Sequence, residues 1–363
     1  MLAGISVLLA AGLEIGSRIV LRFTTGFWPT TEAVRFDREI RTALSLYRRH
    51  PYLNTAPVEG ASAEAFGKSA RFNSLGYRSP ERPLTKPPTI QRVLCAGGST
   101  TFDILAATNE ATWPHRLEAL LRKRDPTVEV WNAGFPGWTT VENLVSLALR
   151  DVDLDPDVVV LYQGINDLQP ASHHPFDRQY VEGHAAESVR ALGFELAPPR
   201  WYEHSVLVER VRILVMGSSS PFDRVARPSM DERRLEELPP EAVAAFERNV
   251  RSFVSLAASH GAQVLLVTQP LRLRQAHLET DRAYLLQWVG GLDADTTVTE
   301  LERFNAVLRG LAADGNAHLA DAAIEISWSD EDFADPMHFS GRGSQRFAEY
   351  LATQIDSRLL GSS

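Results

Sequence analysis

Short apolar runs alternate with amphipathic segments from about residue 90 to the end of the chain. Four of the runs are bounded by Gly, Pro, Asn or Asp and are mostly apolar, which is typical of buried strands; they cover residues 90–96, 128–131, 157–162 and 263–267. Residues 318–320 form a weaker fifth run. The pattern predicts five short strands.

Segments with apolar residues at helical spacing lie between these runs. They predict helices over residues 112–124, 140–149, 243–257, 298–313 and 347–359. Thr139-Thr140 can cap the second helix and His260-Gly261 can end the third. Strands that alternate with helices predict a parallel sheet covered on both faces, a three-layer α/β/α sandwich in which ligands bind beyond the carboxyl ends of the strands.

Three regions differ in pattern. We expect a hydrophobic segment at residues 1–23, an irregular extension with short elements at 24–89, and an α/β domain at 90–360 that carries an insertion at about 170–235. The insertion contains aromatic residues that could floor a cleft or pack inside the insertion itself: Phe176, Tyr180, Trp201 and Tyr202. It forms either a cap over a site or a surface decoration.

Residues 1–23 are uncharged as far as Leu13 and then carry Glu14, Arg18 and Arg22. A membrane anchor is the leading interpretation, and a signal-like segment or an amphipathic helix on a surface are the alternatives. An anchor would place the protein at a membrane or in the cell envelope. The arginines after the apolar part favour a cytoplasmic side instead, so a cytoplasmic location stays open.

The charge balance bears on partners. The 363 residues include 37 Lys and Arg and 46 Asp and Glu, which gives a formal net charge of −9. The sequence has no run of Lys and Arg of the kind that binds a phosphate backbone, so nucleic acid is not an expected partner. The one cysteine, Cys95, lies inside a predicted strand, where a core position is favoured over a thiol nucleophile. The sequence does not indicate the oligomeric state.

Four short segments carry candidate chemistry: Gly97-Gly98-Ser99-Thr100, residues 132–137, Gly164-Ile165-Asn166-Asp167 and Asp335-Pro336-Met337-His338. The first three each follow a predicted strand, so a parallel sheet gathers them at one edge. Taken singly, each has a structural explanation as a helix cap, a turn or a surface ion pair. Their joint occurrence in this order favours a serine hydrolase site.

Each of these residues suits one role in acyl transfer. A serine hydroxyl needs a base, and His338 is the best candidate to activate Ser99, with Asp335 three residues earlier to orient the imidazole. The oxyanion can bind the backbone N–H groups of Ser99 and Gly137 and the side-chain amide of Asn166. Asp167 is expected to hold its turn.

The four segments resemble the sequence blocks of the SGNH/GDSL hydrolase superfamily over roughly residues 90–358. The resemblance implies nucleophile Ser99, oxyanion donors Gly137 and Asn166, base His338 and orienting Asp335, on a flavodoxin-like sheet without metal or cofactor. The first block reads Gly-Gly-Ser-Thr instead of Gly-Asp-Ser-Leu, a variation of bacterial branches that often carry an N-terminal hydrophobic segment. Residues 73–78 also resemble the lead-in of those branches, and no catalytic role is assigned to them.

These observations predict a serine esterase that hydrolyses O-acyl esters, with O-acetyl esters among the candidates, acting on a small-molecule or carbohydrate substrate. Two alternatives remain: an acyltransferase that modifies an envelope polysaccharide with the same triad, and a catalytically silent carbohydrate-binding protein of the same fold. The alternating aspartates at 151–157 resemble a calcium loop, but Pro156 and Tyr162 occupy positions where that loop needs Gly and Glu, so no metal is expected.

Overall fold

The computed structural model describes residues 2–25, 42–48, 50–53, 55–180, 234–272 and 278–360. The chain divides into two compact units, Met1–Ser45 with Ser188–Pro228, and Leu46–Glu187 with Ser229–Ser363. In the first unit, helix α1 (Leu2–Thr25) carries an ion pair between Glu14 and Arg18. Among the described ranges, no helix is long and apolar enough to cross a membrane.

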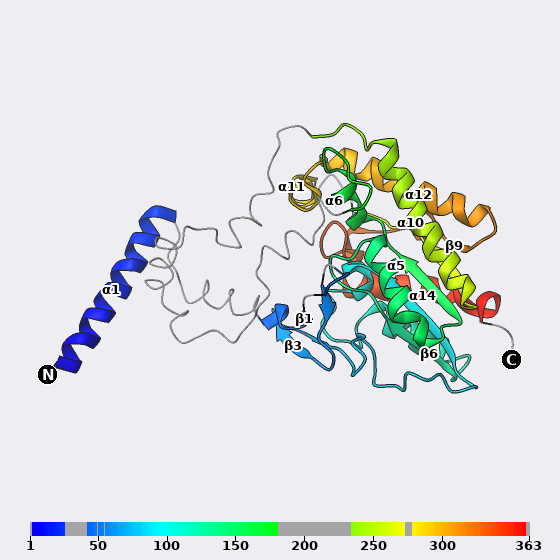
Figure 1. Cartoon of the computed structure of the whole chain (residues 1–363), viewed down its shortest axis with the longest axis horizontal. Coiled ribbons are helices and arrows are strands. Elements are labelled where there is room, and N and C mark those ends of the chain that lie inside the picture. Colours follow the sequence, from blue (N-terminus) through cyan, green and yellow to red (C-terminus); the bar gives the residue numbers. More distant parts are fainter. Residues whose placement is uncertain are drawn as a thin grey trace. The chain divides into compact units, whose positions relative to one another are not determined.

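The second unit is built on the predicted five-stranded parallel sheet (Figure 1). Its strands are β5 (Gln91–Gly97), β6 (Val128–Asn132), β7 (Val158–Tyr162), β8 (Gln263–Val267) and β9 (His318–Ala320). Their order across the sheet is β6-β5-β7-β8-β9, so the connections from β5 and β7 depart in opposite directions. In such a sheet the crevice at the carboxyl ends of these two strands is the expected place for a ligand.

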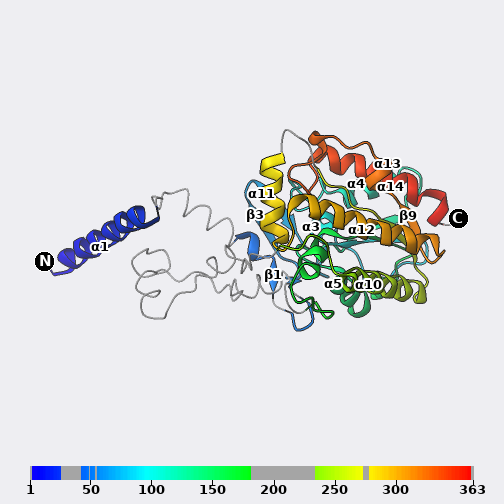
Figure 2. The same cartoon turned by 90° about the horizontal axis from the view of Figure 1, so that it is seen from above.

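Helices cover both faces of this sheet, as the pattern predicts. Helices α5 (Thr140–Leu149), α10 (Pro240–Ser259) and α12 (Ala294–Ala313) pack on one face, and α4 (Trp113–Leu121) and α14 (Gly341–Leu359) on the other (Figure 2). Successive residues of β5 alternate between the two cores, with Leu94 in the first and Cys95 in the second. Both faces are apolar because both are buried.

Local sequence signals fix the ends of the helices. Thr139 and Glu142 form a reciprocal capping box at the start of α5. Pro239 and Pro240 stand at the start of α10, and Gly261, with φ at +87°, follows its end. The structure confirms the predicted cap at Thr139 and the predicted stop at His260-Gly261, but α10, α12 and α14 begin earlier than predicted, at Pro240, Ala294 and Gly341.

The remaining elements are short, apart from α11. They are β1 (Tyr47–Arg48), β2 (Ala56–Pro57), β3 (Ser62–Ala65), β4 (Lys68–Arg71), α3 (Ser99–Phe102), η1 (Asp151–Leu154), η2 (Ile165–Asp167), α6 (Leu168–Ala171), α11 (Leu278–Val289), α13 (Ala322–Glu325) and η4 (Asp330–Asp332). Strands β1 and β2 pair antiparallel, as do β3 and β4. The predicted insertion falls largely on residues 181–233, so Trp201 and Tyr202 lie outside the described residues.

The segment before β5 packs against the rest of the second unit. Phe72 shares a buried cluster with Phe102, Phe135 and Trp138, which belong to the turns after β5 and β6. The indole of Trp138 also donates a hydrogen bond to the carbonyl of Thr55 at 2.9 Å. Residues 46–89 therefore form part of the support beneath the sheet edge where the candidate site lies.

Candidate active site

Ser99 is the first residue of α3, directly beyond the carboxyl end of β5. The two glycines before it allow a close approach of neighbouring strands. A Cβ on Gly97 would lie 2.3 Å from the carbonyl oxygen of Tyr162, and one on Gly98 would lie 2.4 Å from the Asn166 amide nitrogen. Any larger residue would displace either the turn of residues 97–103, which carries the predicted nucleophile Ser99 and is called the nucleophile turn below, or the turn after β7.

The predicted triad residues lie in a continuous hydrogen-bonded chain. The Ser99 Oγ is 2.8 Å from Nε2 of His338, and Nδ1 of His338 is 2.7 Å from Oδ2 of Asp335. The other carboxylate oxygen of Asp335 accepts hydrogen bonds from the backbone N–H groups of Met337 and His338, both at 2.9 Å. Ser99 and His338 are buried. Residues 239 positions apart in the sequence thus meet at one point.

The hydrogen bonds of Asp335 determine which tautomer of His338 is present. Burial alone would raise the pKa of Asp335, but the hydrogen bond and charge of His338 and the two backbone amides lower it below its ordinary value. The carboxylate is therefore ionised at neutral pH and can only accept, which places the imidazole proton on Nδ1. Nε2 is then free to accept the proton of the Ser99 hydroxyl.

Asn166 lies beside the nucleophile turn, on η2 beyond the carboxyl end of β7. Its Nδ2 donates to the carbonyl of Trp138 at 2.8 Å, and Gln163 Nε2 donates to the same oxygen at 3.0 Å. An amide nitrogen carries two hydrogens, so one holds Asn166 in place and the second is available to a ligand. The turns after β5, β6 and β7 thus converge, as the sequence predicts.

Gly137 lies in the turn after β6, directly before Trp138. Its φ is +80°, in the left-handed region where glycine is favoured, and the neighbouring carbonyl of Trp138 lies 3.2 Å from the position of a Cβ on Gly98. The turn after β6 therefore passes directly beside the nucleophile turn. The role of the Gly137 amide as an oxyanion donor stays a prediction.

A protein-family model matches the part of the chain that carries these site segments. The model of the GDSL-like lipase/acylhydrolase family matches residues 95–346, which include the segments of Ser99, Gly137, Asn166 and His338. The chain belongs to this family. It is therefore an enzyme that hydrolyses ester bonds, and the resemblance stated from the sequence blocks is confirmed.

Solved structures of other proteins align with the chain at low similarity. A lipase/acylhydrolase from Enterococcus faecalis is 18% identical, covers 76% of this chain and 100% of its own, and gives a TM-score of 0.42. A GDSL-like lipase from Bacteroides thetaiotaomicron is 13% identical, covers 76% and 93%, with a TM-score of 0.42. A mutant acetyl-xylooligosaccharide esterase from Geobacillus is 14% identical, covers 77% and 100%, with a TM-score of 0.44. No curated protein matches the sequence.

Asp167 connects the two turns beside the nucleophile, as expected of a structural residue. Its buried carboxylate accepts hydrogen bonds from Thr140 N and Oγ1, the latter at 2.5 Å, and from Gln163 Nε2 at 2.9 Å. Burial raises the pKa of Asp167 to about 6, although the hydrogen bonds from Thr140 and Gln163 oppose the shift. The start of α5 is thereby fixed to η2.

Two residues near the catalytic pair were not identified from the sequence. The Tyr284 hydroxyl of α11 lies 3.4 Å from Asp335 Oδ2, and the backbone N–H of Arg272 donates to the Pro336 carbonyl at 2.8 Å. The Arg272 guanidinium also forms an ion pair with Asp281 of α11 at 2.7 Å. No local signal marks either residue, because both reach the loop of Asp335 from elements distant in sequence.

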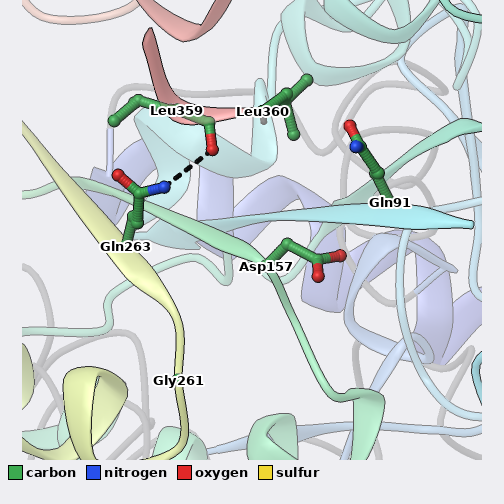
Figure 3. Close-up of a pocket in the computed structure, with 6 residues that line it drawn as sticks. All are labelled: Gln91, Asp157, Gly261, Gln263, Leu359 and Leu360. Carbon is green, nitrogen blue, oxygen red and sulfur yellow. Dashed lines mark hydrogen bonds between the residues drawn. The ribbon is translucent and has the colours of Figure 1, made fainter. Parts of the chain in front are cut away.

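The other candidate positions lie apart from this constellation. Cys95 is fully buried in a strand, and burial raises the pKa of its thiol well above the ordinary value, which excludes a thiolate nucleophile. A cavity of about 190 Å³ lies at the amino edge of the sheet, where β5 and β8 begin, and is therefore at the edge opposite Ser99; Gln91, Asp157, Gly261, Gln263, Leu359 and Leu360 line it (Figure 3). Among the described residues, no cluster of His, Cys, Asp and Glu could hold a metal ion.

Proposed function

We propose that the protein is a serine esterase that cleaves O-acyl esters through an acyl-enzyme. The observation that supports this most directly is the chain of short contacts from Ser99 Oγ through both nitrogens of His338 to the carboxylate of Asp335. A base within hydrogen-bond reach of a serine, itself oriented by an acceptor, is the arrangement that activates a hydroxyl nucleophile.

The reaction begins with attack of Ser99 Oγ on the ester carbonyl carbon while Nε2 of His338 takes the hydroxyl proton. The carbonyl oxygen becomes an oxyanion as the new C–O bond forms. Collapse of this intermediate breaks the bond to the alcohol, which leaves with the proton from His338. A water molecule then attacks the acyl-enzyme, again with His338 as base, and releases the carboxylic acid and free Ser99.

In this scheme, donors from three strand ends hold the oxyanion. The backbone N–H of Ser99 is at the first position of α3, where it has no partner within the helix. The second hydrogen of Asn166 Nδ2 and the backbone N–H of Gly137 complete the set. Loss of one such donor typically lowers turnover about 10²- to 10³-fold.

Replacing the nucleophile tests this proposal. We expect Ser99→Ala to abolish both the hydrolysis of nitrophenyl esters and covalent labelling by a fluorophosphonate, with turnover reduced on the order of 10⁴-fold or more. Ser255→Ala is the matched control, because Ser255 is an exposed serine of α10 whose hydroxyl bonds only its own helix. An esterase rate in Ser99→Ala equal to that of the wild type would refute the assignment.

Two further measurements narrow the reaction. Nitrophenyl esters from acetate to palmitate report the acyl length, with preference for acetate supporting an O-acetyl substrate. A sugar acceptor added to the same assay separates hydrolysis from acyl transfer, since a transferase passes its acyl group to the sugar faster than to water. Sugar binding without fluorophosphonate labelling would instead indicate a silent binding protein, against which the intact Ser99–His338–Asp335 contacts argue.

A further inference from the structure

Arg78 lies beneath the nucleophile turn and is buried, with 3% of its surface exposed. Its Nη1 donates to the backbone carbonyls of Phe102 and Asp103 at 2.9 and 3.0 Å. These two residues end α3, the single helical turn that Ser99 begins. Of the described arginines, Arg78 is the one whose guanidinium contacts this turn.

The other guanidinium nitrogens bind the structure around the turn. Nη2 donates to the carbonyl of Ser69 on β4 at 3.2 Å, and Nε donates to Asn109 Oδ1 at 3.0 Å. The plane of the guanidinium lies over the ring of Phe102, with 4.4 Å from Cζ to the ring centroid. Arg78 therefore holds the last residue of α3 by a hydrogen bond to its carbonyl and by stacking on its side chain.

All four hydrogen-bond acceptors of Arg78 are neutral. A buried cation without a bonded carboxylate is costly, and burial lowers the pKa of Arg78 to about 10, although the nearby charge of Asp103 opposes the shift. Hydrophobic packing alone does not require a guanidinium at this place. Its planar set of donors does match two successive carbonyls at a helix end, which a lysine ammonium cannot reproduce.

The turn that Arg78 holds is also strained and is connected to the base. Asp103 ends α3 with φ at +60°, unusual for a residue other than glycine. Its carboxylate accepts from the backbone N–H of Trp113 and from the hydroxyl of Ser344, each at 2.8 Å. Ser344 is on α14, six positions after His338, so Asp103 links the nucleophile turn to the segment that follows the base.

We propose that Arg78 is a positioning residue of the esterase: by holding the carbonyl end of α3, its guanidinium keeps Ser99 in line with Nε2 of His338. This inference rests on the proposed function, since it assigns Arg78 to the same site. The sequence assigns no catalytic role to residues 73–78, and this proposal gives one of them, Arg78, a part in the reaction. Displacement of a reacting group by about 1 Å can cost about 10²-fold in rate.

Lysine substitutions at two buried arginines test the proposal. In Arg78→Lys we expect kcat and the rate of fluorophosphonate labelling to fall about 10- to 100-fold, with KM changed less than about threefold. The control is Arg82→Lys, because Arg82 lies in the same segment with 9% of its side chain exposed, but binds Glu118 and the Val130 carbonyl, away from the nucleophile turn. Both substitutions should lower the melting temperature, whereas the control should keep kcat within about twofold.

Chemical rescue separates positioning from general stability. Guanidinium ion, added at concentrations that leave the wild type folded, should raise the kcat of Arg78→Ala about tenfold and should have no such effect on Arg82→Ala. The reason is that the cavity left by Arg78→Ala faces the carbonyls of α3, whereas the cavity left by Arg82→Ala does not. If neither Arg78 variant folds, Asn109→Ala leaves Arg78 in place and removes the acceptor of its Nε, together with the hydrogen bonds between the Asn109 side chain and the Arg71 backbone. In that variant a several-fold fall in labelling rate supports the proposal, and an unchanged rate overturns it.

The outcomes distinguish the two proposals. Wild-type protein without turnover that depends on Ser99 would refute the proposed function and this inference together. An active wild type in which Arg78→Lys loses no more kcat than Arg82→Lys would refute the role of Arg78 and leave the esterase assignment intact.

Discussion

The two carboxylate oxygens of Asp335 bind different groups. Oδ1 accepts the backbone N–H groups of Met337 and His338, which fixes the carboxylate on its own loop. Oδ2 accepts from His338 Nδ1 and so selects the tautomer whose Nε2 can receive a proton. A substitution that keeps the backbone hydrogen bonds but favours the other tautomer of His338 would show how much of the activity depends on the tautomer.

Asp335→Asn is such a change. Its carbonyl oxygen can keep the backbone hydrogen bonds, but its NH₂ would face Nδ1 and favour the proton on Nε2, where it blocks acceptance from Ser99. We expect kcat to fall on the order of 10³- to 10⁴-fold with the fold intact, measured by ester turnover and thermal unfolding. Asp314→Asn, an exposed position at the end of α12, is the control. Turnover of Asp335→Asn within twofold of the wild type would contradict the tautomer argument.

At the scale of elements, α5 and η2 are joined by the buried carboxyl of Asp167. The folded protein holds its proton more tightly than the unfolded chain, because burial raises the pKa of Asp167 from 3.8 to about 6. The contribution to stability is therefore fully present below about pH 4 and is lost as the pH rises through about 6. The shift corresponds to about 3 kcal/mol.

Asp167→Asn removes this titration while an amide oxygen can still accept from Thr140. We expect the free energy of unfolding of the wild type, minus that of the variant, to decrease by about 2 kcal/mol between pH 4 and pH 7, which is most of the total. Urea unfolding at several pH values gives this difference. A difference that stays constant with pH would show that the carboxyl does not titrate in this range.

The sequence predicts some of these elements well and others poorly, for a physical reason. Strands such as Gln263–Val267 and the capping box at Thr139 are encoded by adjacent residues, so their positions follow from local patterns. The four site segments could be assigned to one site from the sequence, because three of them follow predicted strands and the fourth forms a single turn. Arg78 and Tyr284 could not be assigned, because their partners are backbone carbonyls or loop residues that only the tertiary fold brings near.

At the scale of the whole molecule, buried polar contacts join the segment before β5 to the rest of the second unit. Arg92 donates to the carbonyls of Pro83 and Leu84, and Arg82 binds Glu118 of α4. The sequence predicts a domain boundary at residue 90, because prolines interrupt any regular hydrophobic pattern before that position. The short strands there are too brief and too polar to show a pattern.

Two truncated chains test that boundary. A chain of residues 90–363 lacks Arg78, Arg82 and the Thr55 carbonyl, so we expect it to lose cooperative unfolding and fluorophosphonate labelling. A chain of residues 46–363 keeps these contacts and should retain both, as measured by circular dichroism during heating and by labelling rate. Cooperative unfolding and full labelling of the shorter chain would support an independent domain that starts at residue 90.

The contact between Ser99 and His338 spans 239 positions, and the last strand of the sheet ends at Ala320. During translation, every strand of the sheet is synthesised before the imidazole proposed to activate the serine. A nascent polypeptide that ends between Ala320 and His338 therefore carries the hydroxyl and all five strands, but neither the proposed base nor α14. Polypeptides that end before residue 338 should consequently lack esterase activity even though they contain every strand of the sheet.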